Sequence, residues 1–350
     1  MKHRFLIRIW LSSAVTLGLA AYATAAIVGP LDLKSLTSGA DLVAVGQVVD
    51  IRDVGPGTIQ TPSGEVEARS MTATLRVERV FKGTAGALVE FDFLLPEPSS
   101  QWWYAPIGLK QFGVFFLRES AGRYRVLDPY HPYIVAVPGA AVTSGNVFED
   151  VVGELAAAVS SPRSSVEVQR EAVYALGPTP GAIATGALLE AARRSDPVVR
   201  FDSMAELLQR NDLTYLTEAA SLLLHPTAND PTLIDNLAVR IGAGIRSPAA
   251  VQVLSDLMAA PAVETRRAAA RALARTGGNT SVLPLARALY DGDQQVQYWA
   301  VIGLARVTGQ NPWYPSLGEF RENGDKYLNH WREWAESNVP KSAAQGSVEP

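Results

Sequence analysis

Short β-branched runs alternate with polar positions along the first part of the chain, between residues 41 and 139. Alternation of this kind is typical of strands in an antiparallel sheet. Turn residues such as Gly55-Pro56-Gly57 and Pro62-Ser63-Gly64 are expected to separate the strands. The expected strands cover residues 42–51, 71–81, 88–95, 112–118, 124–127 and 133–137. Short strands at this spacing predict a small antiparallel barrel or sandwich.

A helical period replaces this alternation after about residue 147, and one nine-residue pattern then recurs. The copies cover residues 168–176, 199–207, 233–241, 265–273 and 296–304. Their closing residues, Leu176, Leu207, Ile241, Leu273 and Leu304, are 31, 34, 32 and 31 residues apart. A period of about 30 residues holds two helices and two turns, which is the unit of an α-solenoid.

The expected helix starts and the last repeat support this interpretation. Four pairs place a capping oxygen before a proline, namely Ser161-Pro162, Asp196-Pro197, Asp230-Pro231 and Ser247-Pro248. Beyond the last copy, an aromatic group has enough bulk to cover the open end of a solenoid: Trp313, Tyr327, Trp331 and Trp334. We expect a C-terminal cap there, with an aromatic ligand site as the alternative.

These patterns predict an α+β protein of two domains, in which a small antiparallel β-barrel precedes an α-solenoid. The expected bounds are residues 26–145 for the β-rich domain and 146–336 for the solenoid with its aromatic cap. Residues 1–25 are expected to form a signal peptide, and residues 337–350 a disordered tail.

The signal peptide is predicted from a basic start, an apolar run over residues 9–21 and the small residues Ala23 and Ala25. The run is shorter than the ~20 residues that span a bilayer. We expect cleavage after Ala25, with an uncleaved N-terminal anchor as the alternative. The mature protein is then expected in the periplasm or secreted, with no membrane span.

Residues 40–48 and 75–83 resemble the OB-fold barrel of netrin-like domains, which include the tissue inhibitors of metalloproteinases. Residues 108–117 resemble a later strand of that barrel. The resemblance covers about 100 residues and implies an OB-like fold. The chain contains no cysteine, and those inhibitors chelate metal through an N-terminal cysteine, so protease inhibition does not carry over.

The five helical copies resemble HEAT repeats, particularly the short bacterial kind related to phycobilisome-lyase repeats. The resemblance implies an α-solenoid that binds other molecules. It implies no lyase activity, because one helical-repeat fold serves many functions.

Composition narrows the chemistry further. The 350 residues include 31 basic and 35 acidic side chains, a net charge of −4 that argues against a nucleic-acid partner. The absence of cysteine excludes disulfides, thiolate metal sites and cysteine nucleophiles. No metalloprotease, nucleophile-elbow, phosphate-loop or dinucleotide motif occurs. We therefore expect no catalytic residue, no metal and no cofactor, and interpret Asp291-Gly292-Asp293 as a loop between repeats.

The preferred hypothesis is an exported, non-enzymatic scaffold that binds a protein, or a glycan, on the concave face of its solenoid, with the barrel loops as a second contact surface. We expect the second helix of each repeat to line the concave face. Polar positions beside the leucines of those helices are the candidate partner-binding residues: Glu190, Arg194, Glu218, Gln252, Asp256 and Arg287. An ordinary solvated face is the alternative interpretation. The partner's identity and the oligomeric state stay open.

Two loops of the β-rich domain carry the rival hypothesis, an enzyme or protease-inhibitor-like module. Trp102, Trp103 and Tyr104 form a candidate aromatic platform for a sugar or a partner, or else a plug on the end of the barrel. The second loop, residues 128–133, contains the lone His131. A turn with locally packed tyrosines is favoured there over a metal or catalytic site.

Overall fold

A computed structural model describes residues 31–339, except for 62–63, 100–103, 140–143, 195 and 227–230. The predicted signal peptide, Trp102, Trp103 and most of the predicted tail lie outside the described residues. Contacts divide the chain into two compact units. The β unit contains the described residues up to Ile134 together with Gly145–Phe148, and the helical unit contains Val135–Ser144 and the chain from Glu149 onward.

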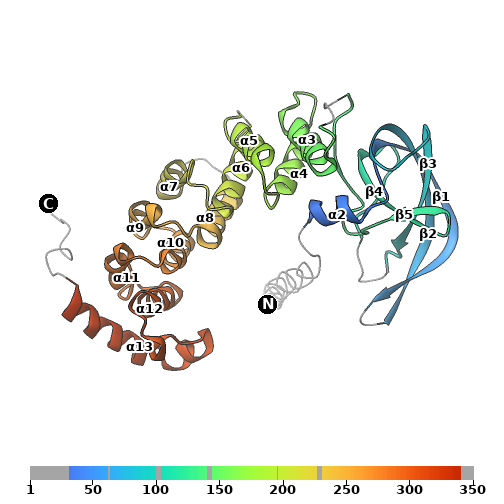
Figure 1. The fold of residues 1–350 in the computed structure, drawn as a ribbon. Helices are drawn as coiled ribbons and strands as arrows, with labels where there is room; N and C mark the ends of the chain where they lie inside the picture. Colours follow the sequence, from blue (N-terminus) through green and yellow to red (C-terminus); the bar gives the residue numbers. More distant parts are fainter. Residues whose placement is uncertain are drawn as a thin grey trace, which may run out of the picture. The chain divides into compact units, whose positions relative to one another are not determined.

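The β unit contains one sheet and a short helix. The elements are α2 (Leu33–Gly39), β1 (Leu42–Thr61), β2 (Gly64–Lys82), β3 (Leu88–Pro96), β4 (Phe112–Ser120), β5 (Arg123–Val126) and β6 (Tyr133–Val135). The strand order is β1-β2-β3-β5-β4-β6, and β4 also pairs with β1 (Figure 1). The pairing of β3 with β5 is parallel, whereas β1 pairs antiparallel with both β2 and β4. All of the expected strands are present.

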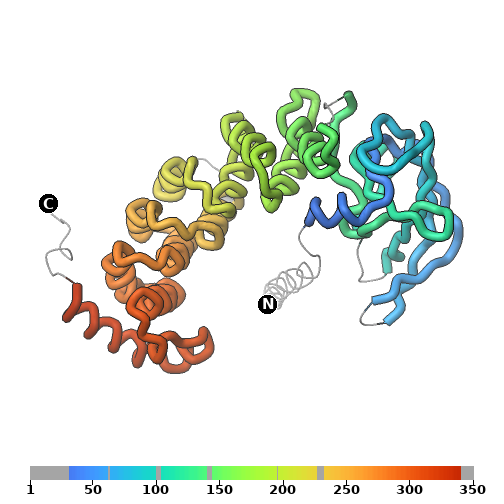
Figure 2. Tube along the Cα trace, in the orientation of Figure 1, coloured from blue at the N-terminus to red at the C-terminus, as the bar shows by residue number. Residues whose placement is uncertain are grey.

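β1 and β2 extend well beyond their predicted lengths and pair as a long antiparallel hairpin (Figure 2). Residues 55–57 were expected to separate strands, but they lie inside β1 and pair with β2. A register shift between Asp53 and Gly55, where Gly55 has φ 135°, accommodates the irregularity. The prediction of a turn there was wrong, because glycine lets a paired strand bulge without leaving the ladder.

Alternate residues of these strands form the core of the β unit. Leu42, Leu75 and Phe91 are fully buried, and the ring of Phe115 lies 5.6 Å from that of Phe91. This is the pattern expected of half-buried strands, in which every second side chain faces the core.

The helical unit contains paired helices in two lengths. The longer ones are α4 (Val166–Leu176), α6 (Pro197–Gln209), α8 (Pro231–Gly244), α10 (Val263–Thr276) and α12 (Gln294–Thr308). The shorter ones are α5 (Ala182–Ala191), α7 (Leu216–Leu224), α9 (Val251–Leu257) and α11 (Val282–Ala288). Helix α3 (Val147–Ser160) precedes them, α13 (Leu317–Asn338) follows them, and the 3₁₀ turns are η1 (Pro248–Ala250), η2 (Asn279–Ser281) and η3 (Asn311–Trp313). Every predicted copy coincides with one of the longer helices.

The paired helices stack in two layers. Each longer helix packs extensively on the next longer helix, whereas successive short helices touch much less. Helices lie closest together on the inner side of a curved stack, and Figure 1 shows the longer helices on the inner side of this unit's arc. We call α4, α6, α8, α10 and α12 the inner layer, and the four short helices the outer layer. The prediction that the second helices line the concave face was therefore wrong.

Small side chains explain the close packing of the inner layer. Each copy contains a buried alanine in its middle or later part: Ala172, Ala205, Ala238, Ala269 and Ala300. Gly242 on α8 reinforces this, since an added Cβ would lie 3.0 Å from the Cα of Ala268 on α10.

Each short helix packs more extensively on the longer helix after it than on the one before. The hairpin that repeats is therefore short helix followed by long helix, a phase that the recurring pattern alone does not reveal.

Two of the four predicted helix starts can be confirmed. Asp196 accepts hydrogen bonds from the backbone amides at the start of α6, and Ser247 caps η1 before α9. Ser161-Pro162 was predicted wrongly, because it forms a turn and Ser165 caps α4 instead. Asp230 lies outside the described residues.

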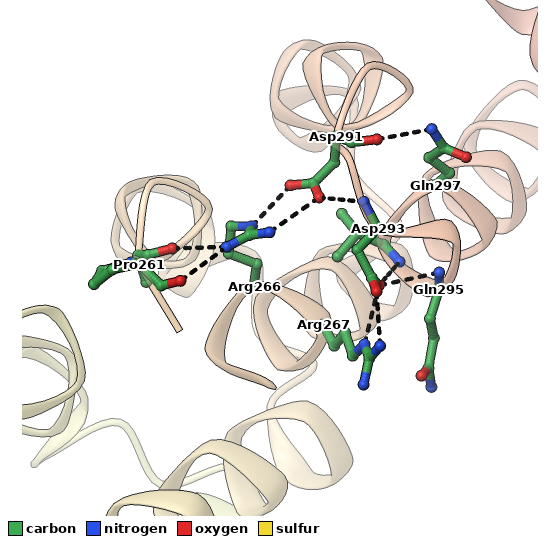
Figure 3. Close-up of polar contacts among 9 residues, drawn as sticks. Pro261, Arg266, Arg267, Asp291, Asp293, Gln295 and Gln297 are labelled. Atoms are coloured by element: carbon green, nitrogen blue, oxygen red, sulfur yellow. Dashed lines mark hydrogen bonds and ion pairs between the residues drawn. The ribbon is translucent and has the colours of Figure 1, made fainter. Parts of the chain in front are cut away.

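The loop between α11 and α12 is held by arginines of α10 (Figure 3). Arg266 Nε donates to Asp291 Oδ2 at 2.9 Å, and Arg267 Nη2 donates to Asp293 Oδ2 at 2.7 Å. Asp293 also accepts from the backbone amides of Gln295 and Val296, which caps α12. Both carboxylates therefore serve the contact between neighbouring repeats.

Helix α13 packs on α11 and α12 at the end of the helical stack. Trp331 is fully buried, and its Nε1 donates to the carbonyl oxygen of Trp313 at 3.3 Å. The ring of Trp313 stacks on His330 with centroids 3.6 Å apart. Aromatic side chains thus cover α11 and α12, where another repeat would otherwise follow.

Candidate functional site

Ion pairs connect consecutive helices of the inner layer. Arg170 on α4 donates to Asp202 on α6 at 2.7 Å, and Arg240 on α8 lies 3.0 Å from Glu206 on α6. Both carboxylates lie on one face of α6, four residues apart. The side chain of Asp202 is only 1% exposed. The two pairs therefore neutralise the acidic charge of α6 where it meets its neighbours.

Burial governs the electrostatics of Glu206. Loss of solvent raises its pKa above the ordinary value, the charge of Arg240 opposes this, and the nearby Asp202 adds to it. Gly177 at the end of α4 leaves room for the carboxylate, since an added Cβ would overlap Glu206 Oε2. This glycine is needed for close approach and not for an unusual backbone angle.

Arginines also cap the C-terminal ends of the inner-layer helices. Arg210 donates to the carbonyl of Leu176 at the end of α4 at 3.5 Å, and Arg306 donates to that of Ala274 near the end of α10 at 3.0 Å. Arg275 does the same for α8, through the carbonyls of residues 242 and 243. Positive charge at a helix C-terminus is favourable. Sequence reasoning missed these residues, although an arginine two or three positions after a closing residue recurs in three copies.

The predicted partner-binding residues of the solenoid lie on or directly beside the outer layer. Glu190 and Arg287 are exposed, and Arg194 donates to the carbonyl of Ser160 at 3.4 Å. Glu218 forms an ion pair with Arg200, and Gln252 donates to Asp256 at 3.0 Å. Only Gln252 and Asp256 are brought together, because the six residues are distributed over α5, α7, α9, α11 and the turn after α5. Their role as binding residues stays a prediction.

A cavity of about 640 Å³ lies in the β unit where the two candidate loops meet. Tyr104 and Tyr130 contact edge to face with ring centroids 5.2 Å apart, and the Ala105 amide donates to the Pro129 carbonyl at 3.1 Å. Apolar side chains such as Met71 line the cavity. The structure therefore brings together two loops that the sequence only identified separately.

One ion pair lies in the wall of this cavity. Arg123 Nη2 donates to Asp92 Oδ1 at 2.7 Å. Hydrogen bonds from Arg123 and Thr72 outweigh the effect of burial and lower the pKa of Asp92. An ionised aspartate paired in this way is a poor general base. The cavity wall thus offers a charged anchor for a ligand.

His131 in the second loop is engaged locally. Its Nδ1 lies 3.0 Å from Asp128 Oδ2, and the Tyr130 amide donates to the other oxygen of Asp128 at 2.9 Å. Burial by itself would raise the pKa of Asp128, but these hydrogen bonds outweigh it and lower the pKa. Across the described residues, no three histidine, aspartate or glutamate side chains gather as they would around a metal ion. No helix in the described part of the chain is long and apolar enough to cross a membrane.

Comparison with known proteins finds similarity in the helical unit. A family model of HEAT repeats matches residues 220–305, from within α7 to α12. An engineered protein of known structure is 19% identical over 55% of this chain and 97% of its own, with a TM-score of 0.36. A designed armadillo repeat protein is 14% identical over 54% of this chain and 93% of its own, with a TM-score of 0.33. Among curated proteins, nothing matches significantly. Residues 220–305 of this helical-repeat solenoid are therefore similar to HEAT repeats.

Proposed function

We propose that this protein is a non-enzymatic scaffold that binds a protein partner along the inner layer of its solenoid. HEAT-like repeats typically serve protein interactions, and their stacked hairpins create extended binding surfaces. The observation that carries the proposal is the continuous inner layer, in which five helices pack in series. Val239 adds an exposed apolar contact, because its side chain on α8 is 59% exposed.

The test compares one substitution in each layer. Val239→Glu introduces a charge on the inner layer, and Ile183→Glu does the same at a 43% exposed position of the outer-layer helix α5. Both residues are exposed, so both variants are expected to fold. Affinity capture with quantitative mass spectrometry is expected to show a partner whose recovery falls about tenfold with Val239→Glu and is unchanged with Ile183→Glu.

Two results would contradict this proposal. If no protein is enriched by the intact chain, the scaffold function is wrong. If Ile183→Glu reduces recovery while Val239→Glu does not, the outer layer is the binding face, and the predicted residues from Glu190 to Arg287 regain their role.

We also propose that the β unit is an OB-like barrel. Neighbouring strands pair in the order β1, β2, β3, β5 and β4. β4 also pairs with β1, the first strand of that order. A five-stranded partly open barrel with a parallel contact between its third and fifth strands has this connectivity.

We further propose that residues 1–25 are a leader for export and that the two domains cover residues 26–145 and 146–336. N-terminal sequencing of the mature protein, with an expected start at Ala26, tests the export.

The second candidate function is a ligand-binding, enzymatic or inhibitory role of the β unit. It is favoured by one observation, the cavity at which the loops of Tyr104 and Tyr130 meet. Deletion of residues 98–106 tests it. If the set of captured partners and ligands is unaltered, the loop takes part neither in partner binding nor in the second candidate function.

A further inference from the structure

Four arginines gather where the inner-layer helices α8, α10 and α12 end. We call Arg246, Arg271, Arg275 and Arg306 the arginine cluster. Arg275 donates to the last carbonyls of α8, and Arg246 follows two residues after that helix ends at Gly244. Arg271 lies one turn before Arg275 on α10. Arg306 donates to the carbonyl of Ala274, the residue next to Arg275.

The positive charge of the arginine cluster is not compensated within the described residues. None of its four members forms an ion pair there, whereas five other arginines of the helical unit do: Arg170, Arg200, Arg240, Arg266 and Arg267. Nε of Arg271 is buried without a hydrogen-bond partner. Burial and the charges of the other three members lower the pKa of Arg275. Like charges held together in this way favour an anion between them.

The donors that remain indicate what kind of anion fits. Arg275 and Arg306 use some of their N–H groups to donate to carbonyls at helix ends. By contrast, no described residue accepts a hydrogen bond from the side chain of Arg246 or Arg271. A guanidinium presents five donors in a planar fork that matches a carboxylate. The guanidinium of Arg271 also lies 5.5 Å from the ring centroid of Trp299, so the indole covers one of its faces.

The spacing of the arginine cluster favours an extended peptide. Arg275 on α10 and Arg306 on α12 each lie two residues after the closing leucine of their copy. Packed helices are about 8–10 Å apart, so these equivalent arginines are separated by one such distance. An extended chain covers that distance in about three residues, at roughly 3.3 Å each. We propose that the arginine cluster binds an extended acidic segment of the partner, with carboxylates about three residues apart. This inference rests on the proposed scaffold function and adds the chemistry of the partner.

A nucleic acid fits the same surface less well. The whole chain carries a net charge of −4, and nucleic-acid binding relies on a broad basic surface that neutralises many phosphates. Only four unpaired arginines are present here, and α6 of the same layer bears two carboxylates. A short acidic peptide carries few charges and does not require a broad basic surface.

The test uses the full chain and a fluorescein-labelled peptide of repeated Glu-Ser-Gly units. Fluorescence anisotropy is expected to show binding that weakens with salt, and a matched peptide of Gln-Ser-Gly units is expected not to bind. The double variant Arg246→Gln/Arg271→Gln avoids the two helix-capping arginines and is expected to lose about tenfold or more in affinity. The control Arg163→Gln/Arg193→Gln removes two other exposed arginines of the helical unit and is expected to bind like the wild type.

Three outcomes would overturn the inference. These are equal binding of the glutamate and glutamine peptides, equal losses in the two double variants, and tighter binding of a single-stranded oligonucleotide of the same charge, which would indicate a nucleic-acid site. The scaffold function fails separately. If the intact chain captures a partner that Val239→Glu releases but Arg246→Gln/Arg271→Gln retains, the scaffold stands and the acidic recognition is wrong.

Discussion

At the scale of single residues, the inner layer contains buried carboxylates whose arginine partners are partly exposed. Glu206 shares α6 with Asp202 and faces Arg240 from α8, with Arg210 also nearby. Taking a carboxylate out of water is costly, and a single arginine only partly offsets this. The raised pKa of Glu206 is the measurable consequence.

Glu206→Gln is expected to change how stability depends on pH. Because burial raises the pKa of Glu206 above 4.5, the folded protein holds this proton more tightly than the unfolded chain does. The wild type therefore loses stability as pH rises from about 4.5 through the raised pKa. Glutamine cannot titrate, so the unfolding free energy of the variant relative to wild type is expected to increase across that window in urea titrations. A difference that is independent of pH would contradict this.

At the scale of elements, neighbouring repeats are joined by polar contacts at the ends of their helices. Asp293 illustrates this, since one carboxylate caps α12 and also binds Arg267 on α10 (Figure 3). The same contact lowers the pKa of Asp293, through the hydrogen bond from Arg267 and those from the backbone. A cap and a contact between repeats are thus combined in one side chain.

Asp293→Ala is expected to destabilise the protein by about 1–2 kcal/mol, because the N-cap of α12 is lost. Asp293→Asn is the matched control. Asparagine keeps the cap and loses only the ionic contact with Arg267, which is partly exposed, so its cost is expected to be smaller. Chemical unfolding of both variants measures the difference. Equal losses would show that the ionic contact, and not the cap, stabilises this junction.

At the scale of the whole molecule, a repeat stack is stabilised through contacts between nearest neighbours. Helix α13 contributes at one end of the helical unit only, where it packs on α11 and α12. Trp331 is the largest fully buried side chain of the described residues. Loss of that side chain is therefore expected to loosen the end of the stack before the rest.

Trp331→Ala is expected to cost about 3–5 kcal/mol locally. Hydrogen exchange is expected to accelerate in α11, α12 and α13 and to stay unchanged in α4, α5 and the β unit. Trp334→Ala, at a partly buried neighbour on the same helix, is the control. Uniform loss of protection along the solenoid would contradict nearest-neighbour stabilisation.

The local patterns of the sequence were sufficient to predict most elements. Alternation located all six strands, and the recurring copies located all five longer helices, because side-chain periodicity follows directly from strand and helix geometry. Prolines and capping residues predicted the starts of α6 and η1. The exception within β1, at Gly55, arose because pairing with β2 compensates for a local break.

The sequence by itself determined that a β unit precedes a solenoid of helical repeats, since both periods are local properties of the chain. Only the tertiary structure decided which helices form the inner layer, although a buried alanine in each copy was consistent with close packing there. It also brought the loops of Tyr104 and Tyr130 together and gathered the arginine cluster from three successive repeats. The reason is physical: periodicity says which side of a helix is buried, whereas packing between distant segments decides what that side contacts and which charges stay unpaired.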